Sequence, residues 1–146
     1  MSRKTKAGRR LAGIVALSAV VAGLTPSTAS ASGNWCGNWL HDPAYAYGVK
    51  AVSGTRGYYN GGYFQVNQGY YGPHWYAWAK EYNTGRYPAL NWVYRNNHGV
   101  YTCYPDVEGV AADYTPGVPD YQAYKVQAEV DTRSGAVYGP AVYWGG

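Results

Sequence analysis

Residues 57–82 read GYYNGGYFQVNQGYYGPHWYAWAKEY, and this stretch decides the fold class. Ten of its 26 residues are Tyr, Trp or Phe, with Gly, Asn and Pro recurring between them. From residue 62 to residue 68 apolar and polar side chains alternate, with Phe64 and Val66 on the apolar side. Alternation with a period of two indicates a strand with one buried face. We therefore expect Phe64, Val66 and Trp78 to be buried, and part of the tyrosines to be exposed.

Further along the chain the same pattern recurs. Residues 121–130 alternate, with Tyr124, Val126, Ala128 and Val130 on one face. Residues 90–94 and 100–104 flank the turn sequence Asn96-Asn97-His98-Gly99, which favours a hairpin that turns Cys103 and Tyr101 to the same side. Turn signals recur every 8 to 15 residues, and the chain is rich in Tyr, Val and Gly. These features predict an all-β fold, a small antiparallel sandwich or barrel.

The N-terminal segment is typical of a secretory signal peptide. Five basic residues precede an apolar run at 11–24, and Ala29-Ser30-Ala31 fits a cleavage site. The run is too short to span a bilayer, which needs roughly 20 apolar residues. We expect residues 1–31 to be removed and residues 32–146 to form one secreted domain. The pair Arg9-Arg10 leaves twin-arginine export open beside the general route.

Cleavage changes the charge of the protein. Residues 1–31 hold five of the 12 basic residues and none of the eight acidic ones, which leaves residues 32–146 at a net charge of −1. A protein that binds nucleic acid or an anionic membrane surface presents a basic face. The charges of the mature domain are scattered singly, so we expect neither a nucleic-acid partner nor membrane insertion.

The chain has two cysteines, Cys36 and Cys103. An even number of cysteines in an exported chain favours a disulfide. This bond would tie the Gly/Asn/Trp-rich segment 32–48 to the middle of the domain.

Three segments resemble one another. Each starts at a proline, at 43, 73 and 119, continues with aromatic residues and reaches a Thr/Gly/Arg-type turn 11 to 13 residues later. One reading is a repeated hairpin that would give two pseudo-symmetric sheets. The other is coincidence in a chain rich in Tyr and Gly.

Catalytic patterns are weak. No G-x-S-x-G sequence occurs, and the mature serines lie at the chain start or in expected turns. His41, His74 and His98 lack metal-ligand spacing, so we expect no metal and no cofactor. Glu81 and Glu129 occupy similar places in the repeat and leave a paired-carboxylate hydrolase as an alternative. We expect a protein that is not an enzyme.

Binding through aromatic side chains is the more favoured function. Tyrosine offers a large contact area at a low entropic cost, and aromatic rings stack on sugar faces. Rings interleaved with Gly, Asn and Pro are typical of loops, where not all of them can be buried. The candidates for an exposed binding surface are Tyr58, Tyr59, Tyr63, Tyr70, Tyr71 and Trp75.

The signal peptide, the cysteine pair and the Tyr-, Gly- and Trp-rich β pattern resemble small exported proteins of high-GC Gram-positive bacteria. Among these, the chain resembles the small adaptor subunit of umbrella toxin particles. In that family the adaptor joins a lectin subunit to a large repeat-containing toxin and performs no chemistry. The likeness lies in size, export, cysteine use and the internal repeat, so no functional residue is carried over.

The resemblance implies a secreted adaptor of an extracellular, antibacterial toxin complex, with a lectin or toxin subunit as its protein partner. Two alternatives stay open. One is a lectin-like protein whose Tyr63 and Trp75 stack on a glycan. The other is an inhibitor of a secreted hydrolase that presents the loop 105–119.

Overall fold

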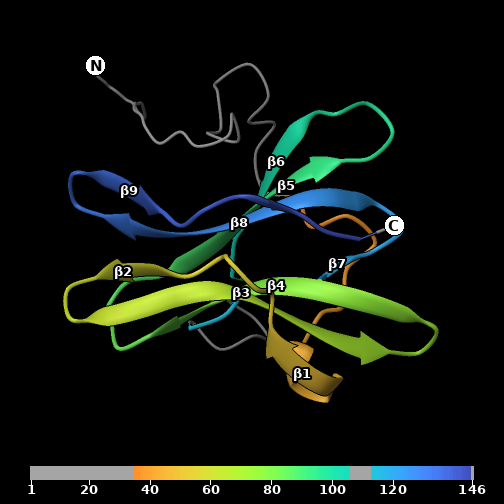
Figure 1. The fold of residues 1–146 in the computed structure, drawn as a ribbon, viewed down its shortest axis with the longest axis horizontal. Coiled ribbons are helices and arrows are strands. Elements are labelled where there is room, and N and C mark those ends of the chain that lie inside the picture. The colour runs from red at the N-terminus through yellow and green to blue at the C-terminus, as the bar shows by residue number, and fades with distance from the viewer. Residues whose placement is uncertain (1–34, 106–112, 146) are drawn as a thin grey trace.

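The computed structural model describes residues 35–105 and 113–145 (Figure 1). The segment read as a signal peptide, residues 1–31, lies outside the described residues. The strands are β1 (Tyr47–Ala51), β2 (Gly57–Tyr59), β3 (Gly62–Tyr71), β4 (His74–Tyr82), β5 (Pro88–Tyr94), β6 (Val100–Cys103), β7 (Val118–Pro119), β8 (Ala123–Thr132), β9 (Gly135–Tyr138) and β10 (Val142–Tyr143). A short 3-10 turn, η2 (Pro43–Tyr45), precedes β1. The described residues contain no helix long and apolar enough to cross a lipid bilayer.

The strands form two antiparallel sheets, which lie one above the other in Figure 1. In sheet 1, β3 pairs with β4 along one edge and with β1 and β2 along the other, and β7 follows β4. In sheet 2, β8 pairs with β5 along one edge and with β9 and β10 along the other, and β6 follows β5. The all-β prediction is therefore confirmed. The two sheets have matching layouts, but their strand orders differ: β1-β3-β4-β7 ascends along the chain, whereas β10-β8-β5-β6 descends to β5 and then returns to β6.

Two hairpins follow from the turn chemistry of the sequence. Strands β3 and β4 pair over nine residues, from Tyr63↔Tyr82 to Tyr71↔His74, around the Gly72-Pro73 turn. Strands β5 and β6 pair on either side of residues 95–99, which confirms the expected hairpin. His98 there has a φ of 57°, a left-handed conformation that the turn requires.

The core lies between the sheets, as the alternation predicted. Sheet 1 contributes Phe64 and Val66, both fully buried, and sheet 2 contributes Leu90, Trp92 and the inward side of β8. The inward residues of β8 are Val126, Ala128 and Val130. Tyr101 packs against this core beside the buried Cys103, which confirms the expected direction of β6.

Trp78 is buried, but not in the core between the sheets. It pairs with Asn67 on the opposite face of sheet 1 from Phe64 and Val66. Its ring lies over Gly69, where the tight approach of Val49 and Ala46 brings β1 and its lead-in onto the same spot. The expectation of a buried Trp78 is confirmed, and its cover is the N-terminal segment and not the second sheet.

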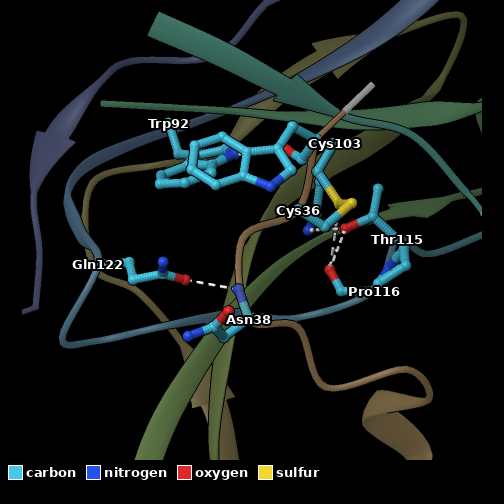
Figure 2. Close-up of a disulfide and its surroundings, with 9 residues drawn as sticks. Cys36, Asn38, Trp92, Cys103, Thr115, Pro116 and Gln122 are labelled. Carbon is cyan, nitrogen blue, oxygen red and sulfur yellow. Dashed lines mark hydrogen bonds between the residues drawn. A yellow bond between two sulfur atoms is a disulfide. The ribbon is translucent and has the colours of Figure 1, made fainter. Parts of the chain in front are cut away.

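The disulfide joins Cys36 to Cys103, 67 residues apart, and is confirmed (Figure 2). The lead-in that it holds is also tied to sheet 2 by hydrogen bonds. The backbone N–H of Trp35 donates to Thr102 O at 3.0 Å, and the indole N–H of Trp92 donates to Trp35 O at 2.9 Å. Asn38 N–H donates to Oε1 of Gln122. Residues 35–38 are thus part of the fold and not a free tail.

The repeated-hairpin reading of the three proline segments is wrong. The second segment runs along β4 into a turn at 83–86 that leads to β5 in the other sheet. The third runs along β8 into a turn that returns within the same sheet as β9. The first opens in η2, and both strands that follow it pair with β3. Similar residues therefore serve different connections, because the partner strands decide where each turn leads.

Candidate functional site

The candidate aromatic residues fall into two groups at opposite ends of β3. Tyr58, Tyr59 and Tyr63 lie where β2 turns into β3, and Tyr70, Tyr71 and Trp75 lie where β3 turns into β4. Figure 1 shows these turns at opposite sides of sheet 1. With a rise of about 3.3 Å per residue, Tyr63 and Tyr71 are on the order of 26 Å apart. The six residues therefore do not form one continuous patch.

The group at the β3–β4 turn is part of a wider aromatic surface, called here the hairpin-end surface. It consists of Tyr47, Tyr70, Tyr71, His74, Trp75 and Tyr121. Tyr47 is the cross-strand partner of Tyr70, whose ring meets the Trp75 ring edge-on with centroids 5.5 Å apart. Tyr71 is the cross-strand partner of His74, whose ring lies 4.5 Å from that of Tyr121. Successive residues of a strand point to opposite faces, so Tyr47, Tyr70 and Trp75 lie on one face of the hairpin end, and Tyr71, His74 and Tyr121 lie on the other.

Asp120 fixes the centre of this surface. Its carboxylate lies 3.4 Å from Nδ1 of His74 and accepts a hydrogen bond from the backbone N–H of Trp75. Its own N–H donates to Trp75 O at 2.9 Å. Burial, followed by the neighbours Tyr121, Asp120 and Tyr71, raises the pKa of the adjacent Tyr76 above its ordinary 10.0. The Tyr76 phenol therefore stays neutral at physiological pH.

Strand β1 adds an exposed edge to the hairpin-end surface. All five residues of β1 are exposed, and Tyr47 has 70% of its surface accessible. Gly48 has a φ of 60°, and the pairing with β3 shifts register between Tyr47 and Lys50. Such an irregularity is a common device at sheet edges, where it limits uncontrolled strand pairing. Strand β1 therefore offers a partner the exposed Tyr47 ring more than a straight free edge.

The group at the β2–β3 turn is organised differently. Tyr63 and Tyr82 stack across β3 and β4, with ring centroids 4.5 Å apart and planes 17° apart. The guanidinium of Arg56 lies 4.0 Å from the Tyr63 ring centre. Arg56 and Tyr82 therefore cover the ring of Tyr63. This geometry does not favour the stacking of a sugar on Tyr63 that the sequence suggested.

The two other tyrosines of this group have opposite environments. Tyr58 is the cross-strand partner of Tyr63, and 71% of its surface is accessible. Tyr59 instead packs against the core between the sheets. Of this pair, Tyr58 offers an open ring to a ligand and Tyr59 helps to close the end of the sandwich.

The two carboxylates considered for hydrolysis do not face one another. Glu81 is the partner of Phe64 at the end of sheet 1, and its Oε1 accepts hydrogen bonds from the N–H and hydroxyl of Thr84. Glu129 lies on the outer face of sheet 2, where its Oε1 accepts from Nδ2 of Asn91 at 2.8 Å. The two acids belong to different faces of different sheets, so no shared cleft places a substrate between them.

The histidines are also dispersed. His41 meets the ring of Trp39, His74 that of Tyr121, and His98 stacks on Tyr124 with centroids 4.8 Å apart. Among residues 35–105 and 113–145, no group of three or more His, Cys, Asp or Glu side chains is placed to hold a metal ion.

A shallow hollow of about 280 Å³ lies at the turn between β4 and β5. Its acids already have partners, because Glu81 accepts from Thr84 and Asp113 pairs with Nζ of Lys80 at 3.0 Å. The other residues that line it are Gly85, Arg86 and Tyr87. Both carboxylates of the hollow are therefore held by neighbours of the same sheet end.

Sequence reasoning did not identify several residues that build these surfaces. Tyr47 and Tyr121 join the hairpin end only through strand pairing, and Arg56 and Tyr82 reach Tyr63 only across β2, β3 and β4. The pairing register was the missing signal, because it decides which distant rings become neighbours. Comparison of the chain with models of protein families, with curated proteins and with solved structures finds no match.

Proposed function

We propose that this protein is a secreted, non-enzymatic adaptor that binds a protein partner through its hairpin-end surface. The proposal takes up the resemblance to the adaptor subunit of umbrella toxin particles, in which the partner would be a lectin or toxin subunit of an extracellular antibacterial complex. The disulfide is consistent with an extracellular setting, since such bonds persist in oxidising compartments.

The observation that carries the proposal is the run of exposed rings at one end of sheet 1. Tyr47, Tyr70, Tyr71 and Tyr121 are all at least 40% exposed. Tyr70 contacts Trp75 on one face of the hairpin end, and Tyr121 contacts His74 on the other. Tyr and Trp are enriched in the centres of protein interfaces. Exposed apolar side chains that gather at one end of a small domain mark an interaction site more often than singly scattered ones do.

Rigidity supports the same conclusion. The rings stand on two long paired strands, and Asp120 holds the backbone and side chain of the hairpin in place. A preorganised surface loses little conformational entropy on binding. This is the property that an adaptor between two larger subunits needs.

The test is a comparison of tagged variants secreted by the organism that produces the protein. The variant Tyr47→Ser with Tyr70→Ser removes two rings that project from exposed positions, so the fold is expected to persist. The matched control is Tyr87→Ser with Tyr143→Ser, which removes two exposed rings elsewhere on the molecule, 65% and 71% accessible against 70% for Tyr47 and 40% for Tyr70. Each protein is purified from culture fluid by its tag, and its companions are identified by mass spectrometry.

The proposal predicts that the wild-type protein and the control variant co-purify with the same large protein in comparable yield. The hairpin-end variant should lose at least about tenfold of that protein, since interface tyrosines commonly contribute more than 1 kcal/mol each. Retention of the same companion by the hairpin-end variant would contradict the proposal. Recovery of a hydrolase in a stoichiometric inactive complex would instead support the inhibitor alternative.

A further inference from the structure

The residues around Arg56 form a closed circuit on the outer face of sheet 1. Nε of Arg56 donates to Oε1 of Gln65 at 3.0 Å, and Nε2 of Gln65 donates to Oδ1 of Asn67 at 2.8 Å. Nδ2 of Asn67 donates to the Tyr82 hydroxyl oxygen at 2.9 Å. Tyr82 stacks on Tyr63, and Tyr63 lies under the Arg56 guanidinium. Every member therefore holds the next one in place.

The two amides at the base of this circuit are buried, although they lie on the face away from the core. Gln65 is 6% exposed and Asn67 is 4% exposed. A buried amide is costly unless its donors and acceptors are paired, and both amides are paired here in a fixed order. Because Gln65 Nε2 donates to Asn67, Oε1 of Gln65 faces Arg56 and accepts its Nε–H. The exposed guanidinium is therefore held in a fixed orientation.

The outer side of the circuit is rich in donors. In residues 35–105 and 113–145, the two Nη atoms of Arg56 form no hydrogen bond or ion pair. Within the same residues, the hydroxyl groups of Tyr63 and Tyr82 donate no hydrogen bond. The bond at Nε leaves the Nη pair as a planar fork, a geometry that suits the two oxygens of a carboxylate or sulfate.

The surroundings add a second cation and an open ring. Nζ of Lys80 lies 5.3 Å from the Tyr82 ring centre and is partly neutralised by Asp113. Tyr58 is the cross-strand partner of Tyr63, whose ring lies under Arg56, and 71% of the surface of Tyr58 is accessible. A sugar can thus place its ring on Tyr58 while its acidic group meets Arg56 and its hydroxyls meet the tyrosine hydroxyls.

We propose that Arg56, Tyr63, Tyr82 and Tyr58 form a binding site for an acidic polysaccharide, in which the Arg56 fork binds a carboxylate or sulfate group of one sugar. The site lies at the opposite end of β3 from the hairpin-end surface, so it does not depend on the proposed adaptor function. A nucleic acid fits less well, because its phosphates need several cations and this strip offers two, one of them paired with Asp113.

The test is affinity electrophoresis of the folded mature protein through native gels that contain one polymer each. Polygalacturonate presents carboxylates, dextran sulfate presents sulfates, and dextran is the neutral reference. Arg56→Gln removes the fork, and Arg56→Lys keeps the charge but not the fork. Arg133→Gln is the matched control, because Arg133 is an exposed arginine in the turn between β8 and β9. Thermal melting verifies that each variant is folded.

We expect retardation of the wild-type protein by at least one acidic polymer and not by dextran. Arg56→Gln should weaken that binding at least about tenfold, because charge-assisted bonds to a guanidinium are among the strong ones. Arg56→Lys should retain only part of the affinity, and Arg133→Gln should bind as the wild type does. Binding to polygalacturonate alone assigns a carboxylate, and binding to dextran sulfate alone assigns a sulfate.

Three results would overturn the site. One is a wild-type protein that neither acidic polymer retards. Another is equal retardation by dextran, which would show that the anionic group has no role. The third is an equal loss of affinity in Arg56→Gln and Arg133→Gln, which would show that binding depends only on the net charge of the protein.

Discussion

Gly62 lies where a side chain would meet the backbone of the neighbouring segment. A Cβ at this position would lie 2.3 Å from Tyr82 O, at the end of β4, and 2.5 Å from the carbonyl carbon of the next residue, Asn83. Gly61, beside it, has open space for a Cβ but a φ of 80°. The two adjacent glycines thus serve different physical needs, close approach of two backbones and a left-handed turn.

The first prediction compares these two positions. Gly62→Ala should destabilise the fold by about 2 kcal/mol or more, because two backbone segments must separate. Gly61→Ala should cost only about 1 kcal/mol, the strain of a left-handed conformation. Urea unfolding followed by tryptophan fluorescence measures both values. Equal losses would show that the approach of β3 to the end of β4 is not as tight as described.

Asn91 is the hub of a polar network on the outer face of sheet 2. Its Nδ2 donates to Gln127 and Glu129, and its Oδ1 accepts from the Thr102 hydroxyl at 2.7 Å. Asn91 and Gln127 are fully buried. The alternation in residues 121–130 correctly puts Gln127 and Glu129 on the face opposite the core. It does not indicate that both side chains on this outer face are buried.

The second prediction concerns this hub. Asn91→Leu should destabilise the protein by about 2–4 kcal/mol, because three buried hydrogen bonds are lost and one of them involves a carboxylate. Asn96→Ala, in the exposed turn between β5 and β6, is the control and should change stability by no more than about 0.5 kcal/mol. Denaturant titration of both variants measures the two changes in the free energy of unfolding. A near-neutral Asn91→Leu would mean that the network adds no net stability.

At the scale of elements, β1 lies close to β3 at Gly69. A Cβ there would lie 2.8 Å from the Ala46 Cβ, 2.9 Å from the Trp78 ring and 3.2 Å from Val49. The glycine therefore lets β1 and its lead-in close over Trp78. A sequence pattern can mark β3 as a strand, but the glycine that admits a third strand is recognisable only once the neighbours are known.

The third prediction follows from this contact. Gly69→Val should loosen β1 from β3 and expose Trp78, while sheet 2 stays intact. Hydrogen exchange should quicken at the amides of β1 and stay slow in β5 and β8. Gly72→Ala is the control for general destabilisation, because its φ of 59° strains the β3–β4 turn while its Cβ meets no neighbour within 4 Å and so leaves the contact with β1 unchanged. Unchanged protection of β1 in Gly69→Val would contradict the role assigned to Gly69.

The strand elements were predictable because their side chains alternate with a period of two. Phe64 and Val66 marked the inward face of β3, and Asn97-His98-Gly99 marked the β5–β6 turn. The candidate binding residues were less predictable, because exposure depends on what packs across a strand. Tyr58 and Tyr59 are adjacent in sequence, yet one is open and the other packs on the core. The register that joins Tyr47 to Tyr70 leaves no trace in local sequence.

At the scale of the whole molecule, one covalent bond joins the lead-in to sheet 2. The Cys36–Cys103 disulfide spans 67 residues and lies beside the buried Trp92 (Figure 2). Between these cysteines the chain builds the strands of sheet 1 from β1 to β4 and then β5 and β6 of sheet 2. The bond therefore restricts the unfolded chain over more than half of the described strands.

The fourth prediction is the contribution of that bond. Replacing both cysteines by alanine should lower the free energy of unfolding by about 4 kcal/mol, the chain-entropy value for a loop of this length. The fold should survive, because Trp35 and Leu40 remain hydrogen-bonded to Thr102 and Gly117. Urea unfolding of the double variant against the oxidised wild type measures the difference. A loss below about 1 kcal/mol would show that the lead-in is held by its other contacts.

The central claim is that this molecule works as part of a larger extracellular assembly. The measurement that tests it most directly is the native size of the untagged protein in the culture fluid of its producer, by size-exclusion chromatography with antibody detection. The account predicts elution in a particle many times larger than the mature chain, and elution near the mass of the chain for the Tyr47→Ser, Tyr70→Ser variant. A wild-type protein that elutes alone at its own mass would contradict the account.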